Sequence, residues 1–387
     1  VIVSPLLTKL AVDAGTDRRR PVLSRLYALG TLGSIAGTLS AGYLFISWIG
    51  STGTIITVAA VYAILGLAFA ISDSLRALFL VLLVACGTSL GWWGQKVQAF
   101  TTPCNIESDY FCIRVADYSD QTGRPSALMA LDHLVHSIND RDDPGLLYSP
   151  YIHAVDELAK FRFKDKPKTF SPRAFFIGGG GYSLPRAWAH DYQDADLIVA
   201  EIDPQVTRAA EQNLWLDRQA PGLTIHHRDA RALLQSLPED QTFDLIFGDA
   251  FHDISIPSHL VTREFHEQIA KRLGKDGIYA VNVVDSGAQP RFLFALIKTL
   301  KLDFSSVEAW IEREETGNPG RVTFMVIASQ TPTLQNTLTS KRGPGRSWQR
   351  WLTRNLEERI AKAAAPVLTD DYAPVDRLMS RLLLQPD

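Results

Sequence analysis

The stretch RAFFIGGGGYSLPRAWAHDYQDADLIVAEID, residues 173–203, decides the fold of this 387-residue chain. An apolar run is followed by four glycines, an amphipathic segment, and a second apolar run that ends in Glu201-Ile202-Asp203. This order predicts a strand, a tight turn, a helix and a parallel strand. Glu201 lies twenty positions beyond Gly181, the spacing of a carboxylate that holds ribose hydroxyls. We therefore expect a nucleotide site made by Gly178, Gly179, Gly180, Gly181, Glu201 and Asp203. Asp203 is equally suited to capping the next helix.

Short apolar runs continue to alternate with amphipathic stretches after this unit, which predicts a doubly wound α/β sheet. The expected strands are 174–177, 197–202, 223–227, 243–247, 277–283, 307–311 and 322–328, preceded by a hairpin of 111–116 and 127–131. Ligands of such sheets bind at the carboxyl ends of the strands. The acids at these ends are therefore the candidate site residues.

Two further strands end in acidic motifs. The third expected strand is followed by Asp229 and Ala230, where a carboxylate can accept a hydrogen bond from the exocyclic amine of adenine. The fourth is followed by Asp249 and Asp253, which suit a cationic amine, and one of them can act as a base. A late cluster is either a helix-capping turn or the completion of an amine-binding wall: Asp370, Asp371 and Tyr372.

The N-terminal quarter of the chain is strongly apolar. The stretches 26–49, 54–71 and 75–93 each approach the roughly 20 residues that span a bilayer as a helix. Buried helices of a soluble core are the alternative, although three such runs in succession are typical of membranes. Gly33 and Gly37 have the spacing of close helix packing, which predicts a homo-oligomer, with a dimer as the simplest case.

Charge gives conflicting indications of orientation. A net charge of −3 provides no pull toward nucleic acid, so we expect no nucleic-acid partner. The arginine cluster around Arg19 predicts that the first helix starts on the cytoplasmic side of an inner or plasma membrane. Three crossings would then leave the soluble part outside, whereas a cytosolic donor requires it inside. We expect a cytosolic catalytic domain, and the helix count and the charge rule conflict with this expectation.

Composition divides the chain into a transmembrane region (1–95), a hairpin and linker (96–172) and a catalytic domain (173–387). Cys104 and Cys112 either form a disulfide or remain two thiols. The cysteine and histidine spacing predicts no metal site.

Taken together, these motifs resemble the spermidine synthase family of aminopropyltransferases, especially its members fused to membrane helices. The resemblance covers about 106–384. It depends on LDHLVH at 131–136, IGGGG at 177–181, EID at 201–203, RDAR at 228–231, DAFHD at 249–253, Ile256-Pro257, TREF at 262–265 and LTDDYAPVD at 368–376.

The resemblance implies a class I methyltransferase-like, Rossmann-like fold that binds a sulfonium donor along the glycine loop. It also implies that Glu201 holds the ribose, that Asp229 lies at the adenine and that Asp249 deprotonates or orients the attacking amine. Asp253 would hold the substrate, Tyr151 would line the amine channel and His136 would contact the donor.

One departure from the family pattern has a chemical consequence. The family usually reads GGGDG, and Gly181 takes the place of that aspartate. The aspartate attracts the ammonium of decarboxylated S-adenosylmethionine and would repel the carboxylate of S-adenosylmethionine by about 1 kcal/mol or more. Its absence favours S-adenosylmethionine as donor and N-methylation of putrescine or a related polyamine, similar to putrescine N-methyltransferases. The alternatives are aminopropyl transfer from the decarboxylated donor and a membrane sensor without turnover.

Overall fold

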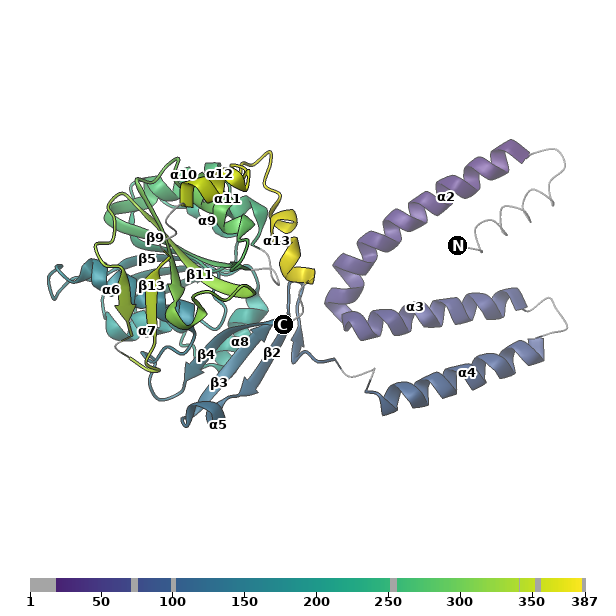
Figure 1. The fold of residues 1–387 in the computed structure, drawn as a ribbon. Helices are drawn as coiled ribbons and strands as arrows, with labels where there is room; N and C mark the ends of the chain where they lie inside the picture. The colour runs from purple at the N-terminus through teal and green to yellow at the C-terminus, as the bar shows by residue number, and fades with distance from the viewer. Residues whose placement is uncertain are drawn as a thin grey trace. The chain divides into compact units, whose positions relative to one another are not determined.

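The computed structural model describes residues 19–70, 76–98, 102–250, 256–340, 342–351 and 356–384 (Figure 1). The chain divides into two compact units, Val1–Pro103 and Cys104–Asp387. This division lies close to the predicted boundary at residue 95. The further boundary at residue 172 stays a prediction.

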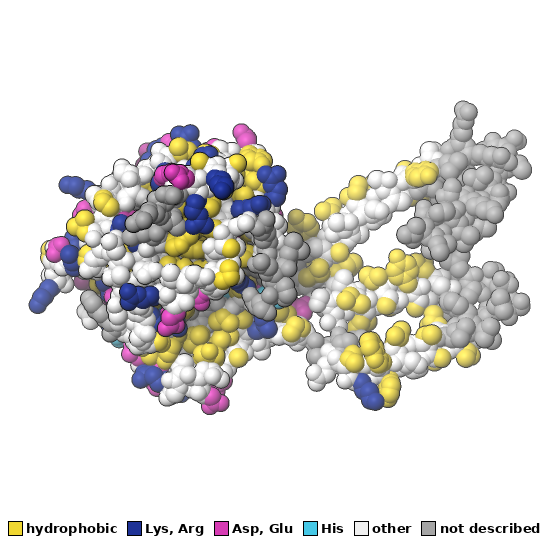
Figure 2. Space-filling model, viewed as in Figure 1, with side chains coloured by type: hydrophobic (Ala, Val, Ile, Leu, Met, Phe, Trp, Pro, Cys, Tyr) yellow, Lys and Arg dark blue, Asp and Glu magenta, His cyan; other side chains and the backbone are white. Residues whose placement is uncertain are grey.

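The described part of the first unit is helical. Its elements are α2 (Arg19–Ser40), a π-helix (η1, Ala41–Phe45), α3 (Ile46–Ala70) and α4 (Arg76–Lys96). Patches of apolar side chains lie along these helices (Figure 2), and Leu32, Trp48 and Ile55 are all exposed within the unit. In the described residues, two windows are long and apolar enough to cross a membrane, Tyr27–Phe45 and Trp48–Gly66. The third predicted span, 75–93, falls largely on α4 and stays a prediction.

The second unit begins with an antiparallel sheet of four strands, in the order β1-β2-β3-β4. The predicted hairpin corresponds to β2 (Cys112–Asp117) and β3 (Ser126–Leu131), with the short helix α5 (Ser119–Thr122) in its turn. Flanking strands β1 (Ile106–Glu107) and β4 (Leu134–Asp140) extend it. The sheet is therefore larger than the two strands expected from alternation alone.

The main sheet has nine strands, in the order β12-β13-β10-β11-β9-β8-β5-β6-β7. The strands are β5 (Arg173–Ile177), β6 (Asp196–Ala200), β7 (Leu223–His226), β8 (Phe243–Gly248), β9 (Leu273–Ser286), β10 (Ser306–Glu312), β11 (Arg321–Ser329), β12 (Thr337–Thr339) and β13 (Ser347–Arg350). All seven predicted strands are present. The expectation of seven was too low because β12, at the edge of the sheet, and β13, next to it, are short and lack an apolar run.

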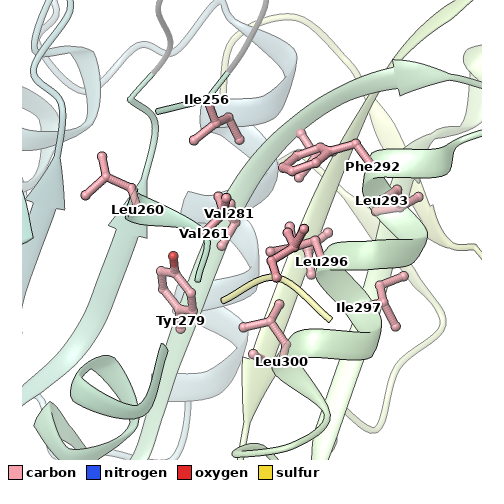
Figure 3. Packing of buried hydrophobic residues seen from close by; sticks show 14 of the residues in the cluster. Ile256, Leu260, Val261, Tyr279, Val281, Phe292, Leu293, Leu296, Ile297 and Leu300 are labelled. Carbon is pink, nitrogen blue, oxygen red and sulfur yellow. The ribbon is translucent and has the colours of Figure 1, made fainter. Parts of the chain in front are cut away.

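Helices cover both faces of this sheet. They are α6 (Pro150–Phe163), α7 (Ser183–Asp191), α8 (Pro204–Asn213), α9 (Ala230–Ser236), α10 (Arg263–Arg272), α11 (Arg291–Leu300), α12 (Leu356–Lys362) and α13 (Val375–Leu384), with 3-10 turns at Ser258–Leu260 (η2) and Arg313–Glu315 (η3). One apolar cluster joins the sheet to α9–α13, and a second joins it to α6–α8. Figure 3 shows the first cluster, where Tyr279 and Val281 of β9 face Leu296 of α11.

The strand order fixes the place where a ligand can bind. Strands β6 and β8 lie on opposite sides of β5, and both run parallel to it. The chain direction across the sheet therefore reverses between β5 and β8. Doubly wound sheets bind ligands at such a switch point, beyond the carboxyl ends of the strands.

Candidate active site

The glycine bend begins where β5 ends. Gly178 has φ +95° and Gly180 has φ +50°, values that favour glycine. The backbone of Asp249 passes so close that a Cβ at Gly178 would lie 2.7 Å from the Asp249 carbonyl oxygen. The bend therefore needs glycine at 178 for space as well as for conformation.

Glu201 ties the bend to the end of β6. Its carboxylate accepts hydrogen bonds from the N–H groups of Gly179 (2.8 Å), Gly180 (3.4 Å) and Asp203 (2.8 Å). Burial raises the pKa of Glu201, and these hydrogen bonds oppose the rise. An ionised carboxylate has about four acceptor positions, so one remains for a ribose hydroxyl.

A cavity of about 190 Å³ opens beside the bend. Its lining includes seven of the predicted site residues: His136, Gly178, Gly180, Glu201, Asp229, Ala230 and Asp249. Residues far apart in the sequence thus meet at the switch point, around one cavity. The remaining predicted residues that the structure describes do not line it.

Asp229 lies at the start of α9, on the cavity wall. Its carboxylate accepts from the N–H of Ala232 (2.9 Å) and bonds the Nε2 atom of His259 at 2.7 Å. The hydrogen bond from His259 is the main cause that lowers the pKa of Asp229. His259 also lines the cavity, and no motif in the sequence indicated it.

Asp249 follows β8 and is held firmly. Its N–H donates to the carbonyl of Ile177 (2.9 Å), and its carboxylate accepts from Asn282 Nδ2 (2.9 Å). Burial raises the pKa of Asp249 to about 7, while hydrogen bonds from Asn282 and Tyr151 oppose the rise. A carboxyl that titrates near neutrality can accept a proton from an amine during reaction.

Tyr151, near the start of α6, lies between two cavities. Its hydroxyl donates to the carbonyl oxygen of His136 (2.8 Å) and is also within hydrogen-bonding reach of Asp249. The same tyrosine lines a second cavity of about 230 Å³, together with Trp310, Glu312 and Glu315.

Three predictions of direct ligand contact receive a different explanation. Asp203 caps α8 by accepting from the N–H of Gln205, and it also bonds the Ser108 hydroxyl at 2.5 Å. Gly179 donates to Glu201 rather than lining the cavity. Gly181 donates instead to Ser137 Oγ at 2.8 Å. These three residues therefore support the residues around the cavity through hydrogen bonds and do not line the cavity themselves.

The predicted amine-binding wall is also not part of either cavity. Asp370 forms a bidentate pair with Arg231, with both N–O distances 2.7 Å. Asp371 and Tyr372 are exposed, and the Tyr372 hydroxyl accepts from Arg377 (2.9 Å). The charge of Asp370 is thus already matched within the fold. Asp253 lies outside the described residues.

Packing around Gly181 explains the missing family aspartate. A Cβ at 181 would lie 2.7 Å from Ser137 Oγ and 2.8 Å from Leu214 Cδ2. The next residue, Tyr182, is buried, and its hydroxyl lies 2.6 Å from Thr207 Oγ1. The loop is therefore built around glycine at 181, and the aspartate is excluded by its neighbours.

A disulfide-closed loop supplies two cavity residues that the motifs did not reveal. Cys104 and Cys112 are bonded, which resolves the two open alternatives for these cysteines in favour of a bridge. Tyr110 and Phe111, which line the cavity, lie within this loop. Ser108 fixes the loop through Asp203 and through the N–H of Phe111 (2.8 Å). A disulfide persists in oxidising compartments, which is at odds with the expected cytosolic side.

Opening this disulfide should weaken nucleoside binding. In the full chain purified in detergent, Cys104→Ser with Cys112→Ser should lower the free energy of unfolding by roughly 2–3 kcal/mol and raise the dissociation constant for S-adenosylhomocysteine several-fold. Calorimetric titration with and without a dithiol reductant checks this. Cys86→Ser, at the free exposed cysteine, is the matched control. Equal affinity in the open and closed forms would contradict the role assigned to the loop.

Comparison with known proteins gives consistent relatives. No family model matches the sequence. A polyamine aminopropyltransferase of Vibrio vulnificus (strain CMCP6) is 34% identical over 137 residues, which are 35% of this chain and 44% of that protein. A probable polyamine aminopropyl transferase of Bifidobacterium longum (strain NCC 2705) is 26% identical over 222 residues, covering 53% of this chain and 48% of that protein. The matches thus span less than half the length of these curated relatives.

A solved structure shares the fold. A probable spermidine synthase from Corynebacterium glutamicum ATCC 13032 superposes with a TM-score of 0.57 at 19% identity, covering 71% of this chain and 99% of that one. This likeness concerns the fold alone. The two sequence matches and the shared fold agree: the chain is similar to polyamine aminopropyltransferases, the spermidine synthases.

Proposed function

We propose that this protein transfers an aminopropyl group from decarboxylated S-adenosylmethionine to an amine such as putrescine. The sequence relatives are named as polyamine aminopropyltransferases, which supports this reaction over N-methylation. N-methylation was the reaction that the sequence favoured because of Gly181. The observation that carries the proposal is that Glu201, Asp229 and Asp249 line one cavity.

The residues of the cavity fit a sulfonium nucleoside. When bound, such a donor supplies an electrophilic carbon next to its sulfur. Glu201 would accept hydrogen bonds from the ribose, and Asp229 would accept from the adenine amine. Asp249 would orient the amine and take its proton as the new C–N bond forms and the C–S bond breaks, which releases methylthioadenosine. Positioning and charge stabilisation supply most of the rate in such a direct displacement.

N-methyl transfer from S-adenosylmethionine is a second candidate, favoured by one observation. Ser137 and Leu214 enclose Gly181 and leave no room for the aspartate usual in the family. The site therefore has no carboxylate at 181 that would attract the ammonium of decarboxylated S-adenosylmethionine or repel the carboxylate of S-adenosylmethionine. The two donors differ by that carboxylate. The same cavity can therefore serve either reaction.

Product analysis separates these functions. The full chain in detergent is incubated with putrescine and each donor in turn, and the products are identified by mass. We expect spermidine from the decarboxylated donor. N-methylputrescine from S-adenosylmethionine would support the second candidate. Donor binding without any product would favour the non-catalytic sensor and contradict both transfers.

We further propose that the first unit anchors the protein in a lipid bilayer. Two of its segments are long and apolar enough to cross a bilayer, Tyr27–Phe45 and Trp48–Gly66. Their large side chains are exposed within the unit. Gly33 and Gly37 meet no atom within 4 Å of an added Cβ, which leaves room for a second helix and supports a homo-oligomer.

A further inference from the structure

Asn282 lies beside Asp249 because of the register of two central strands. Strands β8 and β9 are parallel, and Gly248 pairs with Val281, so the next residue of each strand is Asp249 and Asn282. Asn282 Nδ2 donates to Asp249 Oδ1 at 2.9 Å. Asn282 is only 5% exposed, so water does not compete strongly for this bond.

The other end of the same amide has no partner among the described residues. Asn282 Oδ1 is buried, and within the described ranges it accepts no hydrogen bond. An unsatisfied buried acceptor costs stability, by about 1–3 kcal/mol in typical cases. The hydrogen bond that this side-chain amide does make is the one donated from its Nδ2 end. That end touches Asp249.

A neutral donor suits a general base better than a cation does. A lysine or arginine beside Asp249 would stabilise the ionised carboxylate strongly and weaken it as a base. An amide N–H orients the same oxygen without adding charge. The hydroxyl of Tyr151, also uncharged, is the other hydrogen-bonding group at this carboxylate among the described residues.

We propose that Asn282 is a positioning residue for the transfer reaction: its amide N–H fixes the Asp249 carboxylate so that the carboxylate can take the proton of the attacking amine. The inference rests on the proposed function, because it assigns Asp249 as the base. Neither the sequence motifs nor the cavity lining includes Asn282.

The pH profile tests the proposal. In Asn282→Ala the loss of the hydrogen bond should raise the pKa of Asp249 further, so the acidic limb of kcat/KM should move up by about one pH unit. Turnover at neutral pH should fall by roughly tenfold. Asn282→Asp should move the limb further, because an ionised neighbour cannot donate and also repels. Affinity for S-adenosylhomocysteine should stay within about twofold.

Two controls keep the test specific. Asn213→Ala removes an exposed asparagine whose amide bonds the Ala209 carbonyl (3.0 Å), and its profile should match the parent. Infrared spectroscopy across a pH titration follows the C=O band of the buried carboxylic acid. The band that is missing in Asp249→Asn is assigned to Asp249, and its titration measures the same pKa shift without turnover. If the parent protein makes no product, the infrared titration still tests whether Asn282 lowers the pKa of Asp249. A folded Asn282→Ala protein would overturn the inference if its acidic limb of kcat/KM and its Asp249 infrared band titrated at the same pH as in the parent protein.

Discussion

Asp249→Asn should lower product formation by roughly 10²–10⁴-fold while leaving S-adenosylhomocysteine affinity nearly unchanged. Asparagine has the same shape and can keep contact with Asn282 and Tyr151, but it cannot accept a proton from the amine. Single-turnover rates and calorimetric titration measure the two effects separately. In the parent protein, turnover should rise with pH through about 7, because burial raises the pKa of Asp249 to about 7 and the ionised form is the base.

Stability provides the control for this variant. The folded pKa of Asp249, about 7, lies above its ordinary value of 3.8, so the folded state holds a proton that the unfolded chain releases. Asp249 therefore lowers stability progressively as pH rises from 3.8 through 7. Asparagine does not ionise and so carries no such loss of stability. The thermal midpoint of Asp249→Asn at pH 8 should therefore not fall below that of the parent protein. Retained turnover in a folded variant would remove Asp249 from its assigned role.

Gly181→Asp, the substitution that restores the family's usual residue, should damage the site rather than improve donor selection. Its Cβ would meet Ser137 Oγ at 2.7 Å and Leu214 Cδ2 at 2.8 Å. Such overpacking costs about 1–3 kcal/mol, and a buried carboxylate without a partner adds to it. We expect a lower thermal midpoint and loss of nucleoside binding.

Gly345→Asp is the matched control, because Gly345 is exposed and a Cβ there meets nothing within 4 Å. Thermal unfolding and titration with both donors measure the outcome for each variant. A Gly181→Asp protein that folds like the parent and gains preference for the decarboxylated donor would contradict this account of the loop.

Strand ends were predictable from the sequence because apolar runs and their terminal residues are local features. Glu201 and Asp249 follow such runs directly, and parallel strands bring their carboxyl ends to one edge. Ligand contact by Asp203 and Asp370 stays a prediction. Asp203 caps α8, which was the alternative expected from the sequence. Both carboxylates also bond partners that are distant in the sequence, Ser108 and Arg231.

Other site residues depend on register and tertiary packing. Asn282 sits within a long strand, and only the pairing of β8 with β9 places it at Asp249. His259 reaches Asp229 from a separate turn. Tyr110 and Phe111 line the cavity because a disulfide and Ser108 fold their loop, although the flanking cysteines were a usable signal. The importance of glycine at 181 likewise became visible only through its neighbours.

A structure of the full chain determined with bound 5′-methylthioadenosine tests the central claim most directly. The account predicts ribose oxygens within about 3 Å of the Glu201 carboxylate, the adenine beside Asp229, and the sulfur between the glycine bend and Asp249. A nucleoside bound outside this cavity, or bound in it with Glu201 and Asp249 both beyond contact, would contradict the claim.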